Sequence, residues 1–292
     1  CQLLLDDQDP YRHMDNTSKF QQPTQESNWS TTLFIVINSR ADNFDRRQRL
    51  RETWLNKPNI IRELCSPSNS LVVPLSSTSS RGHQQKQLAF EARIERIEWV
   101  FALGHLGPAN SIAIDARLRH ESQFYGDLLV FDLLESYRNM TKKHLAIFNW
   151  LLEKEGDKSA QHHHHQHHRH ILLKCDDDVQ LDLSQMISRY VMEENVGNSG
   201  GTPTSNLLMC ARFEENSPVL RKFTHQTTKW SLSRQEWPYD TFPSYCSGLA
   251  YLASLELVEK LHLIAPLVDE SLQQQPLWID DVYVTGILLA SL

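Results

Sequence analysis

Three consecutive aspartates directly follow an apolar run in Ile171-Leu172-Leu173-Lys174-Cys175-Asp176-Asp177-Asp178-Val179. In an open parallel sheet, ligands bind beyond the carboxyl ends of the strands, so these acids lie where a site is expected. Adjacent like charges are unfavourable unless a cation compensates them, and a hard divalent ion with oxygen ligands suits them. Side chains alternate along an extended segment, which puts Asp176 and Asp178 on one face and Asp177 on the other. The pattern predicts a metal-binding carboxylate pair, although a solvated acidic turn that caps a helix would produce it too.

A second acidic element, Asp280-Asp281, stands between apolar residues in the segment Trp278–Gly286, where a helix is expected to begin at Val282. Carboxylates at a helix N-terminus stabilise the helix by about 0.5–2 kcal/mol, and taken alone this pair is interpreted in that way. The sharper hypothesis is a general base within reach of a metal-bound substrate.

The elements that must position these acids are predicted from the apolar pattern. Short apolar runs bounded by polar or turn residues predict strands at Leu33–Ile37, Leu71–Leu75, Leu128–Phe131, Ile171–Leu173 and Leu207–Cys210. One helix is expected over Lys86–Leu103, where apolar side chains share a helical face at Phe90, Ile94, Ile97 and Phe101. Another is expected over Thr141–Glu155. Strands that alternate with helices predict an α/β fold with a mostly parallel sheet and helices on both faces.

Composition narrows the function classes. The chain has 292 residues, with 29 Lys and Arg against 36 Asp and Glu, for a formal net charge of −7. The chain has no excess of basic residues that could neutralise phosphates, so no nucleic-acid partner is expected. No apolar run approaches the roughly 20 residues of a membrane span. Residues 1–31 are polar and without periodicity, and they are predicted to be a disordered stem or linker before a domain over residues 32–292.

Two further features leave alternatives open. Five cysteines (Cys1, Cys65, Cys175, Cys210, Cys246) permit two disulfides and one free thiol, and the sequence does not pair them. The segment 157–170 contains a run of histidines, interpreted as a low-complexity surface loop in preference to a metal-binding tract, because such runs have no fixed ligand geometry. Three N-x-S/T sequons, at Asn16, Asn28 and Asn139, favour a secretory compartment.

Four blocks follow one another along the chain. The first is Phe44-Asp45-Arg46-Arg47-Gln48-Arg49-Leu50-Arg51-Glu52-Thr53-Trp54, and the second runs from Tyr125-Gly126-Asp127 to Thr141-Lys142-Lys143. The third is the aspartate triplet, and the fourth extends from Lys229-Trp230 through Trp237-Pro238 and Cys246-Ser247-Gly248 to Asp280-Asp281-Val282-Tyr283. In this order the blocks resemble the β1,3-glycosyltransferases of glycosyltransferase family 31, which includes β1,3-galactosyl- and β1,3-N-acetylglucosaminyltransferases, and the triplet resembles the family's D-x-D element.

The resemblance implies a GT-A fold, a Rossmann-like α/β domain that binds a nucleotide sugar at the carboxyl ends of its strands. It implies Mn²⁺, held by Asp178 and Asp176, and a donor that is UDP-galactose or UDP-N-acetylglucosamine. Further donor-side candidates are Arg46, Arg47, Arg51, Lys143 and Asp177, although each arginine could equally belong to a surface helix paired with acids. The implied reaction inverts the anomeric carbon, with Asp281 as the base that deprotonates the acceptor hydroxyl. If the alignment is one residue off, Asp280 is the base and Asp281 the cap.

The resemblance also sets expectations about the whole protein. Family members continue beyond the Asp-Val-Tyr helix with a segment that often supplies a metal-binding histidine, so this chain is expected to be C-terminally truncated. A membrane anchor before the stem and a lumenal Golgi location are implied in the same way. Where many members have Gly-Gly-Tyr after Cys-Ser-Gly, this chain has Leu249-Ala250-Tyr251, which adds bulk beside the expected sugar site. The competing hypotheses are a non-catalytic nucleotide- or glycan-binding homologue and a two-metal phosphohydrolase.

Overall fold

The computed structural model describes residues 29–56, 92–107, 111–159, 168–187, 189, 206–221, 229–272 and 275–292. The expected strand Leu71–Leu75 lies outside these ranges, as do residues 1–28 of the predicted stem and 160–167 of the histidine-rich loop.

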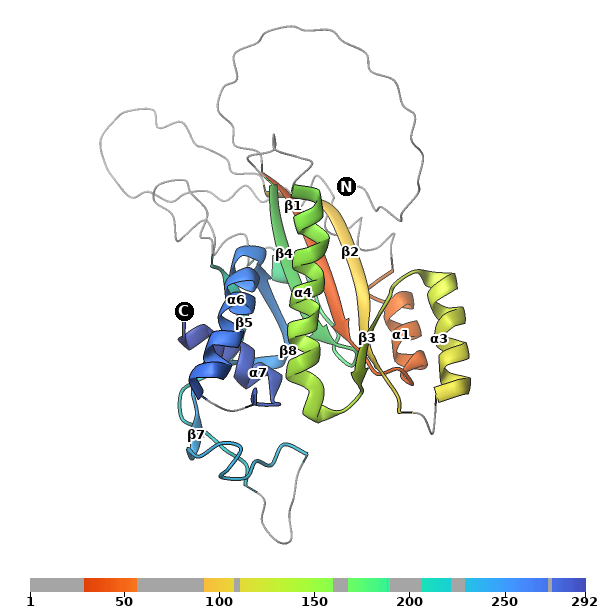
Figure 1. Cartoon of the computed structure of the whole chain (residues 1–292). Helices are drawn as coiled ribbons and strands as arrows, with labels where there is room; N and C mark the ends of the chain where they lie inside the picture. Colours follow the sequence, from red (N-terminus) through yellow and green to blue (C-terminus); the bar gives the residue numbers. More distant parts are fainter. Residues whose placement is uncertain are drawn as a thin grey trace, which may run out of the picture.

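A six-stranded sheet forms the centre of the structure, with the strand order β3-β2-β1-β4-β8-β5 (Figure 1). The strands are β1 (Trp29–Asn38), β2 (Ala92–His105), β3 (Leu128–Leu134), β4 (His168–Asp176), β5 (Leu208–Phe213) and β8 (Tyr245–Ser254). Strand β1 pairs in parallel with β2 and β4, and β2 pairs in parallel with β3. Strand β8 runs antiparallel to both β4 and β5. The prediction of a mostly parallel sheet is confirmed.

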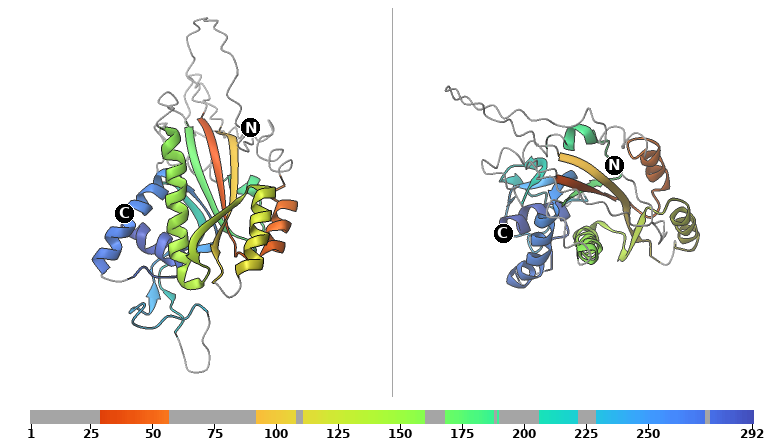
Figure 2. Two further views of the ribbon diagram at one scale, coloured as in Figure 1. Left: turned by 45° about the vertical axis from the view of Figure 1, so that its right-hand side comes forward. Right: turned by 90° about the horizontal axis from the view of Figure 1, so that it is seen from above.

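Helices cover both faces of the sheet, as Figure 2 shows. They are α1 (Phe44–Glu52), α3 (Ser111–Tyr125), α4 (Met140–Ser159), α6 (Leu255–Leu272) and the short α7 (Asp280–Val282), which continues as the π-helical turn η4 (Tyr283–Leu288). A 3₁₀ turn, η3 (Tyr137–Asn139), precedes α4, and a small pair of strands, β6 (Ser217–Pro218) and β7 (Thr241–Phe242), lies apart from the sheet. The expected helix over Thr141–Glu155 is therefore confirmed as part of α4.

Strand β1 shows why helices must pack on both faces of the sheet. Leu33 and Ile35 belong to one apolar core, together with Leu50 of α1. Phe34 belongs to the core on the other face, together with Phe148 of α4. Because successive side chains point to opposite faces, a strand that is apolar at every position must be buried on both.

The helix expected over Lys86–Leu103 is wrong, because residues 92–105 form strand β2. In the pairing with β1, Thr31 faces Ile94 but Thr32 faces Arg96, so β2 carries one extra residue at this point. This irregularity puts Ile94 and Ile97 in the same core although they are three residues apart. A β-bulge thus produced a spacing that imitates one face of a helix.

Strand β1 begins at Trp29, so Trp29–Thr31, assigned to the stem from composition, belong to the sheet. Helix α4 extends to Ser159 and β4 begins at His168, which confines the histidine-rich connection to fewer residues than expected. Among the described residues, no helix is both long and apolar enough to cross a bilayer.

Candidate active site

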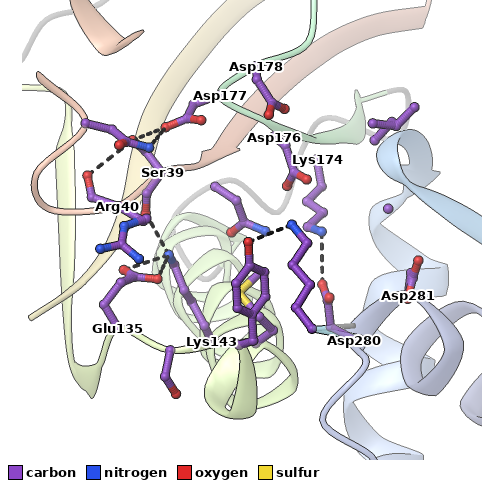
Figure 3. Close-up of a pocket in the computed structure, with 18 of the residues that line it drawn as sticks. Ser39, Arg40, Glu135, Lys143, Lys174, Asp176, Asp177, Asp178, Asp280 and Asp281 are labelled. Carbon is purple, nitrogen blue, oxygen red and sulfur yellow. Dashed lines mark hydrogen bonds and ion pairs between the residues drawn. The ribbon is translucent and has the colours of Figure 1, made fainter. Parts of the chain in front are cut away.

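A pocket of about 330 Å³ lies at the carboxyl ends of β1 and β4, where the sheet topology predicts ligand binding. Its walls come from the loop after β1, the start of α4, the aspartate triplet after β4, the first half of β8 and the start of α7. Figure 3 shows how acids from distant parts of the chain meet there. Most of the predicted site residues line it: Arg46, Lys143, Asp176, Asp177, Asp178 and Asp281.

Within the triplet, Asp177 is the acid that binds the protein itself. Its buried carboxylate accepts hydrogen bonds from Ser39 Oγ at 2.6 Å and Asn43 Nδ2 at 2.8 Å, and Arg46 Nη1 lies 2.8 Å from its other oxygen. In Figure 3 it points toward Ser39, whereas Asp176 points toward Lys174. Asp177 therefore joins the end of β4 to α1, and the alternation expected for an extended segment accounts for its separate direction.

Asp176 and Asp178 are the members of the triplet that remain for a ligand. Burial raises the pKa of Asp176, and the charges of Asp280 and Asp178 raise it further, against the opposing effect of Lys174. Asp178 is exposed and lies 3.1 Å from Arg46 Nη1. A cation placed between these carboxylates would relieve the repulsion, and carboxylate oxygens are suitable donors for Mn²⁺. The two residues thus fit a divalent ion.

The described residues contain no group of three or more His, Cys, Asp or Glu side chains placed to hold a metal ion. A metal at Asp176 and Asp178 would need the remaining ligands from a bound substrate or water. Within the described part of the chain, nothing supplies the additional ligands that the phosphohydrolase hypothesis requires for two metals.

Asp280 is held in a buried cluster. Its Oδ2 lies 3.0 Å from Lys174 Nζ and 2.9 Å from His144 Nδ1, while His144 Nε2 lies 2.6 Å from the Tyr251 hydroxyl. An ionised carboxylate can only accept, so His144 donates from Nδ1 and its Nε2 accepts from Tyr251. The positive charge of Lys174 and the hydrogen bond from His144 outweigh burial and hold the pKa of Asp280 well below its usual range. A carboxylate of this kind is a poor base.

Asp281 has the opposite environment. It lines the pocket, and burial together with the neighbouring charge of Asp280 raises its pKa to about 6. Its Oδ1 accepts a hydrogen bond from the Val282 backbone N–H at 2.9 Å. A Cβ at Gly248 would lie 3.2 Å from Oδ2, so a larger residue there would push the Asp281 carboxylate by a few tenths of an ångström. Of the two adjacent acids, Asp281 has the exposure and the basicity of a proton acceptor.

Comparison with known proteins shows the family of this chain. The family described as "Galactosyltransferase" matches residues 45–292, most of the chain. This chain belongs to the galactosyltransferase family. Among similar proteins is UDP-GalNAc:beta-1,3-N-acetylgalactosaminyltransferase 1 of Rattus norvegicus, 26% identical over 259 residues, which cover 88% of this chain and 59% of the relative. Another is the lactosylceramide 1,3-N-acetyl-beta-D-glucosaminyltransferase of Homo sapiens, 22% identical over 252 residues, 86% of this chain and 52% of the relative. The chain thus spans somewhat more than half the length of these relatives.

In this galactosyltransferase-family chain, Lys143 is buried, and its ammonium binds other groups of the pocket wall. Lys143 Nζ donates to the Ser39 carbonyl at 2.8 Å and lies 3.2 Å from both oxygens of Glu135. Glu135 also accepts from the Gly104 N–H at 2.7 Å. Glu135 could not be recognised from the sequence, because a single acid after a strand carries no distinctive pattern. The pair shapes the pocket wall beside the β1 loop.

Arg47 and Arg51, expected on the donor side, do not line the pocket. Arg47 is completely buried and pairs with Glu121 through two hydrogen bonds of 2.8 and 2.7 Å. Arg51 pairs with Asp127 through two bonds of 2.7 Å and also contacts Glu121 at 2.8 Å. Both arginines therefore join α1 to α3, Arg51 also reaches Asp127 just before β3, and only Arg46 of the three lines the pocket. Helical spacing alone does not tell which arginine faces which neighbour.

A disulfide supports the segment of β8 that leads to the pocket. Cys210 of β5 is bonded to Cys246, with the two Cα atoms 5.7 Å apart, while Cys175 is a buried free thiol. The Cys246 N–H also donates to Thr285 Oγ1 at 2.8 Å, which connects β8 to η4. The two contacts hold the strand just before Gly248, the residue that faces Asp281.

Proposed function

We propose that this chain is the catalytic domain of an inverting β1,3-hexosyltransferase, which moves a hexose from a UDP-sugar to a hydroxyl of a glycan acceptor on glycoprotein or glycolipid. The observation that carries the proposal is the meeting of Asp176, Asp178 and Asp281 in one pocket. The two relatives described above are named as β1,3-transferases of N-acetylhexosamines. UDP-galactose and UDP-N-acetylglucosamine are the proposed donors, and UDP-N-acetylgalactosamine joins them because of the first relative's name.

Asp281 is proposed as the catalytic base. An inverting transfer needs a carboxylate that takes the acceptor hydroxyl proton while the oxygen attacks the anomeric carbon opposite to the leaving UDP. Asp281 lines the pocket, and burial and the charge of Asp280 raise its pKa to about 6, against hydrogen bonds from the backbone of Val282 and Gly248. A raised pKa makes it a stronger proton acceptor than an ordinary aspartate, yet keeps it ionised at neutral pH.

The donor side would use the opposite wall. Asp176 and Asp178 would hold Mn²⁺, which when bound neutralises the charge of the diphosphate leaving group. Arg46, oriented by Asp177 and Asp178, adds a fixed positive charge beside them. Asp177 keeps the loop after β1 against this wall through Ser39. The protein is acidic overall, so these local charges are what make a diphosphate site attractive.

The activity should depend on pH through Asp281. The base works only when ionised, so kcat/KM should fall about tenfold for each pH unit below about 6 and reach a plateau above it. The check is a kcat/KM profile between pH 5 and 8, with UDP affinity measured over the same range to separate binding from proton transfer. A profile that stays flat down to pH 5 would contradict the proposed base.

The donor site is tested through metal and nucleotide binding. We expect Mn²⁺ to tighten UDP binding and Asp178→Ala to abolish that effect, since the exposed carboxylate is replaced by a methyl group. Calorimetric titration of UDP with and without Mn²⁺ is the measurement, and Asp182→Ala, four residues further along the chain, is the matched control. Metal-independent UDP binding in the wild-type protein would remove the proposed metal role of Asp176 and Asp178.

A screen of the three UDP-sugars with Mn²⁺ tests the function as a whole. Transfer or slow hydrolysis of one donor is expected. Tight UDP binding with no turnover of any donor would instead favour the non-catalytic binding homologue. The proposed setting is the Golgi lumen, with a membrane anchor outside the described residues and no nucleic-acid partner.

A further inference from the structure

An aromatic corner forms one rim of the pocket. It consists of Tyr137 of η3, Trp230 and Trp278. The Trp230 and Trp278 rings are parallel, with 6° between their planes and 6.3 Å between their centroids. Tyr137 meets Trp230 edge to face, with centroids 5.2 Å apart. Three aromatic rings from distant parts of the chain thus build one rigid surface.

The corner is incompletely buried. Trp278 is 7% exposed, but Trp230 is 40% and Tyr137 is 44% exposed, and these two line the pocket. Leaving large aromatic rings in contact with water forgoes the free energy that burial would contribute. Large exposed rings inside a pocket, next to acids, are typical of a surface that a ligand covers.

Charged groups hold the corner in place before any ligand arrives. The Arg138 guanidinium lies 4.5 Å from the centroid of the Trp278 ring and forms an ion pair with Glu236. Trp278 Nε1 donates to the same glutamate at 3.3 Å. Lys229 Nζ donates to the Tyr137 hydroxyl at 2.8 Å and lies 4.8 Å from the centroid of the Trp230 ring. A preorganised surface loses less conformational entropy when it binds.

The chemistry of this surface fits a sugar. A pyranose ring has an apolar face of C–H groups and an edge of hydroxyls. The exposed part of the Trp230 ring, which Trp278 and Lys229 leave uncovered, offers apolar surface, and the Lys229 ammonium has three N–H donors, of which Tyr137 uses one. We propose that Trp230, with Tyr137 and Lys229, forms a stacking subsite for a neutral pyranose ring of the acceptor glycan. This inference rests on the proposed transferase function.

The position of the corner favours the acceptor over the donor's uracil, which could also stack on an aromatic ring. Trp230 stacks on Trp278, and Trp278 stands three residues before Asp281, the proposed base. The donor's diphosphate would instead lie at Asp176, Asp178 and Arg46, on the wall formed by the end of β4 and the start of α1. A sugar held at the corner would lie in the same pocket as the group that takes its proton.

The test compares Trp230→Leu with Trp230→Phe, which keeps an aromatic plane. The control is Tyr239→Leu, because Tyr239 is 65% exposed and lies outside the pocket lining. Saturation-transfer NMR and titration use methyl β-galactopyranoside, methyl N-acetyl-β-glucosaminide and methyl β-lactoside, with UDP and Mn²⁺ titrated separately. We expect Trp230→Leu to weaken binding of the preferred glycoside about tenfold, and Trp230→Phe and Tyr239→Leu to stay within about threefold. UDP affinity should be unchanged in all variants.

Other binding results would overturn the subsite. Unchanged glycoside affinity in Trp230→Leu, or no binding of any of the three glycosides by the wild-type protein, means that the corner is not an acceptor surface. Weaker UDP binding in Trp230→Leu with unchanged glycoside binding assigns the corner to the uracil. Binding needs no turnover, so a protein that binds glycosides through Trp230 but transfers no sugar would refute the proposed function and retain the subsite.

Discussion

We expect Asp281→Asn to lower turnover by about 10²–10⁴-fold while UDP affinity with Mn²⁺ stays within about twofold. The amide has nearly the same shape as the carboxylate but cannot take the acceptor proton. The effect should fall on kcat, because the missing interaction is needed only when the acceptor hydroxyl attacks. Steady-state kinetics with the best donor from the screen, together with UDP calorimetry, measure both quantities.

Asp269→Asn is the matched control. This carboxylate accepts a hydrogen bond of 2.6 Å from the Tyr283 hydroxyl and therefore supports η4, close to Asp281 in sequence but outside the pocket lining. We expect its turnover to remain within about threefold of the wild-type value. Full activity in Asp281→Asn would move the base elsewhere in the pocket, and equal losses in both variants would indicate a general effect on the C-terminal helix.

Arg47→Met should be the most destabilising single substitution in α1, lowering the free energy of unfolding by about 3–5 kcal/mol. Arg47 is fully buried, and besides Glu121 it donates to the carbonyls of Arg40 and Ala41 at 2.5 and 3.2 Å. Methionine fills similar volume but leaves these acceptors without this donor, and Glu121 retains only the contact with Arg51. Urea unfolding followed by circular dichroism measures the change.

Arg49→Met provides the comparison on the same helix. Arg49 is exposed, and within the described residues its side chain donates only to the Asp45 carbonyl, at 3.3 Å, so its replacement should change stability by no more than about 0.5 kcal/mol. A loss below about 1 kcal/mol in Arg47→Met would show that the buried pair with Glu121 is not what secures α1. The same contacts position the loop after β1, so the pocket wall depends on them.

The strands of the sheet could be predicted from the sequence only in part. Continuous apolar runs such as Leu33–Ile37 identify strands buried on both faces, because no polar position interrupts the alternation. The apolar positions of β2 predict a helix, because a bulge near Ile94 gives them a helical spacing. Such a shift depends on pairing with β1 and is not visible in a single strand.

Local pattern and the family resemblance point to the acids of the site, but the partners that set their environments do not follow from the sequence. Asp280 and Asp281 are chemically identical neighbours, yet Lys174 and His144 hold one while the other lines the pocket. Lys174 and His144 each lie more than a hundred residues before Asp280 in the sequence, and neither forms a recognisable motif with it. The sequence therefore does not reveal that they contact Asp280. Their contact arises only when α4, β4 and α7 converge.

By itself, the sequence determined the α/β class, the aspartate triplet at the end of a buried strand, and the family that the four ordered blocks indicate. These features depend on residue type and on spacing along the chain. Tertiary structure alone decided that Arg46 faces the pocket while Arg47 and Arg51 face α3, that Cys210 pairs with Cys246, and that Asp281 has the raised pKa. Burial and partner charge belong to the space around a side chain, and residues distant in sequence create that space.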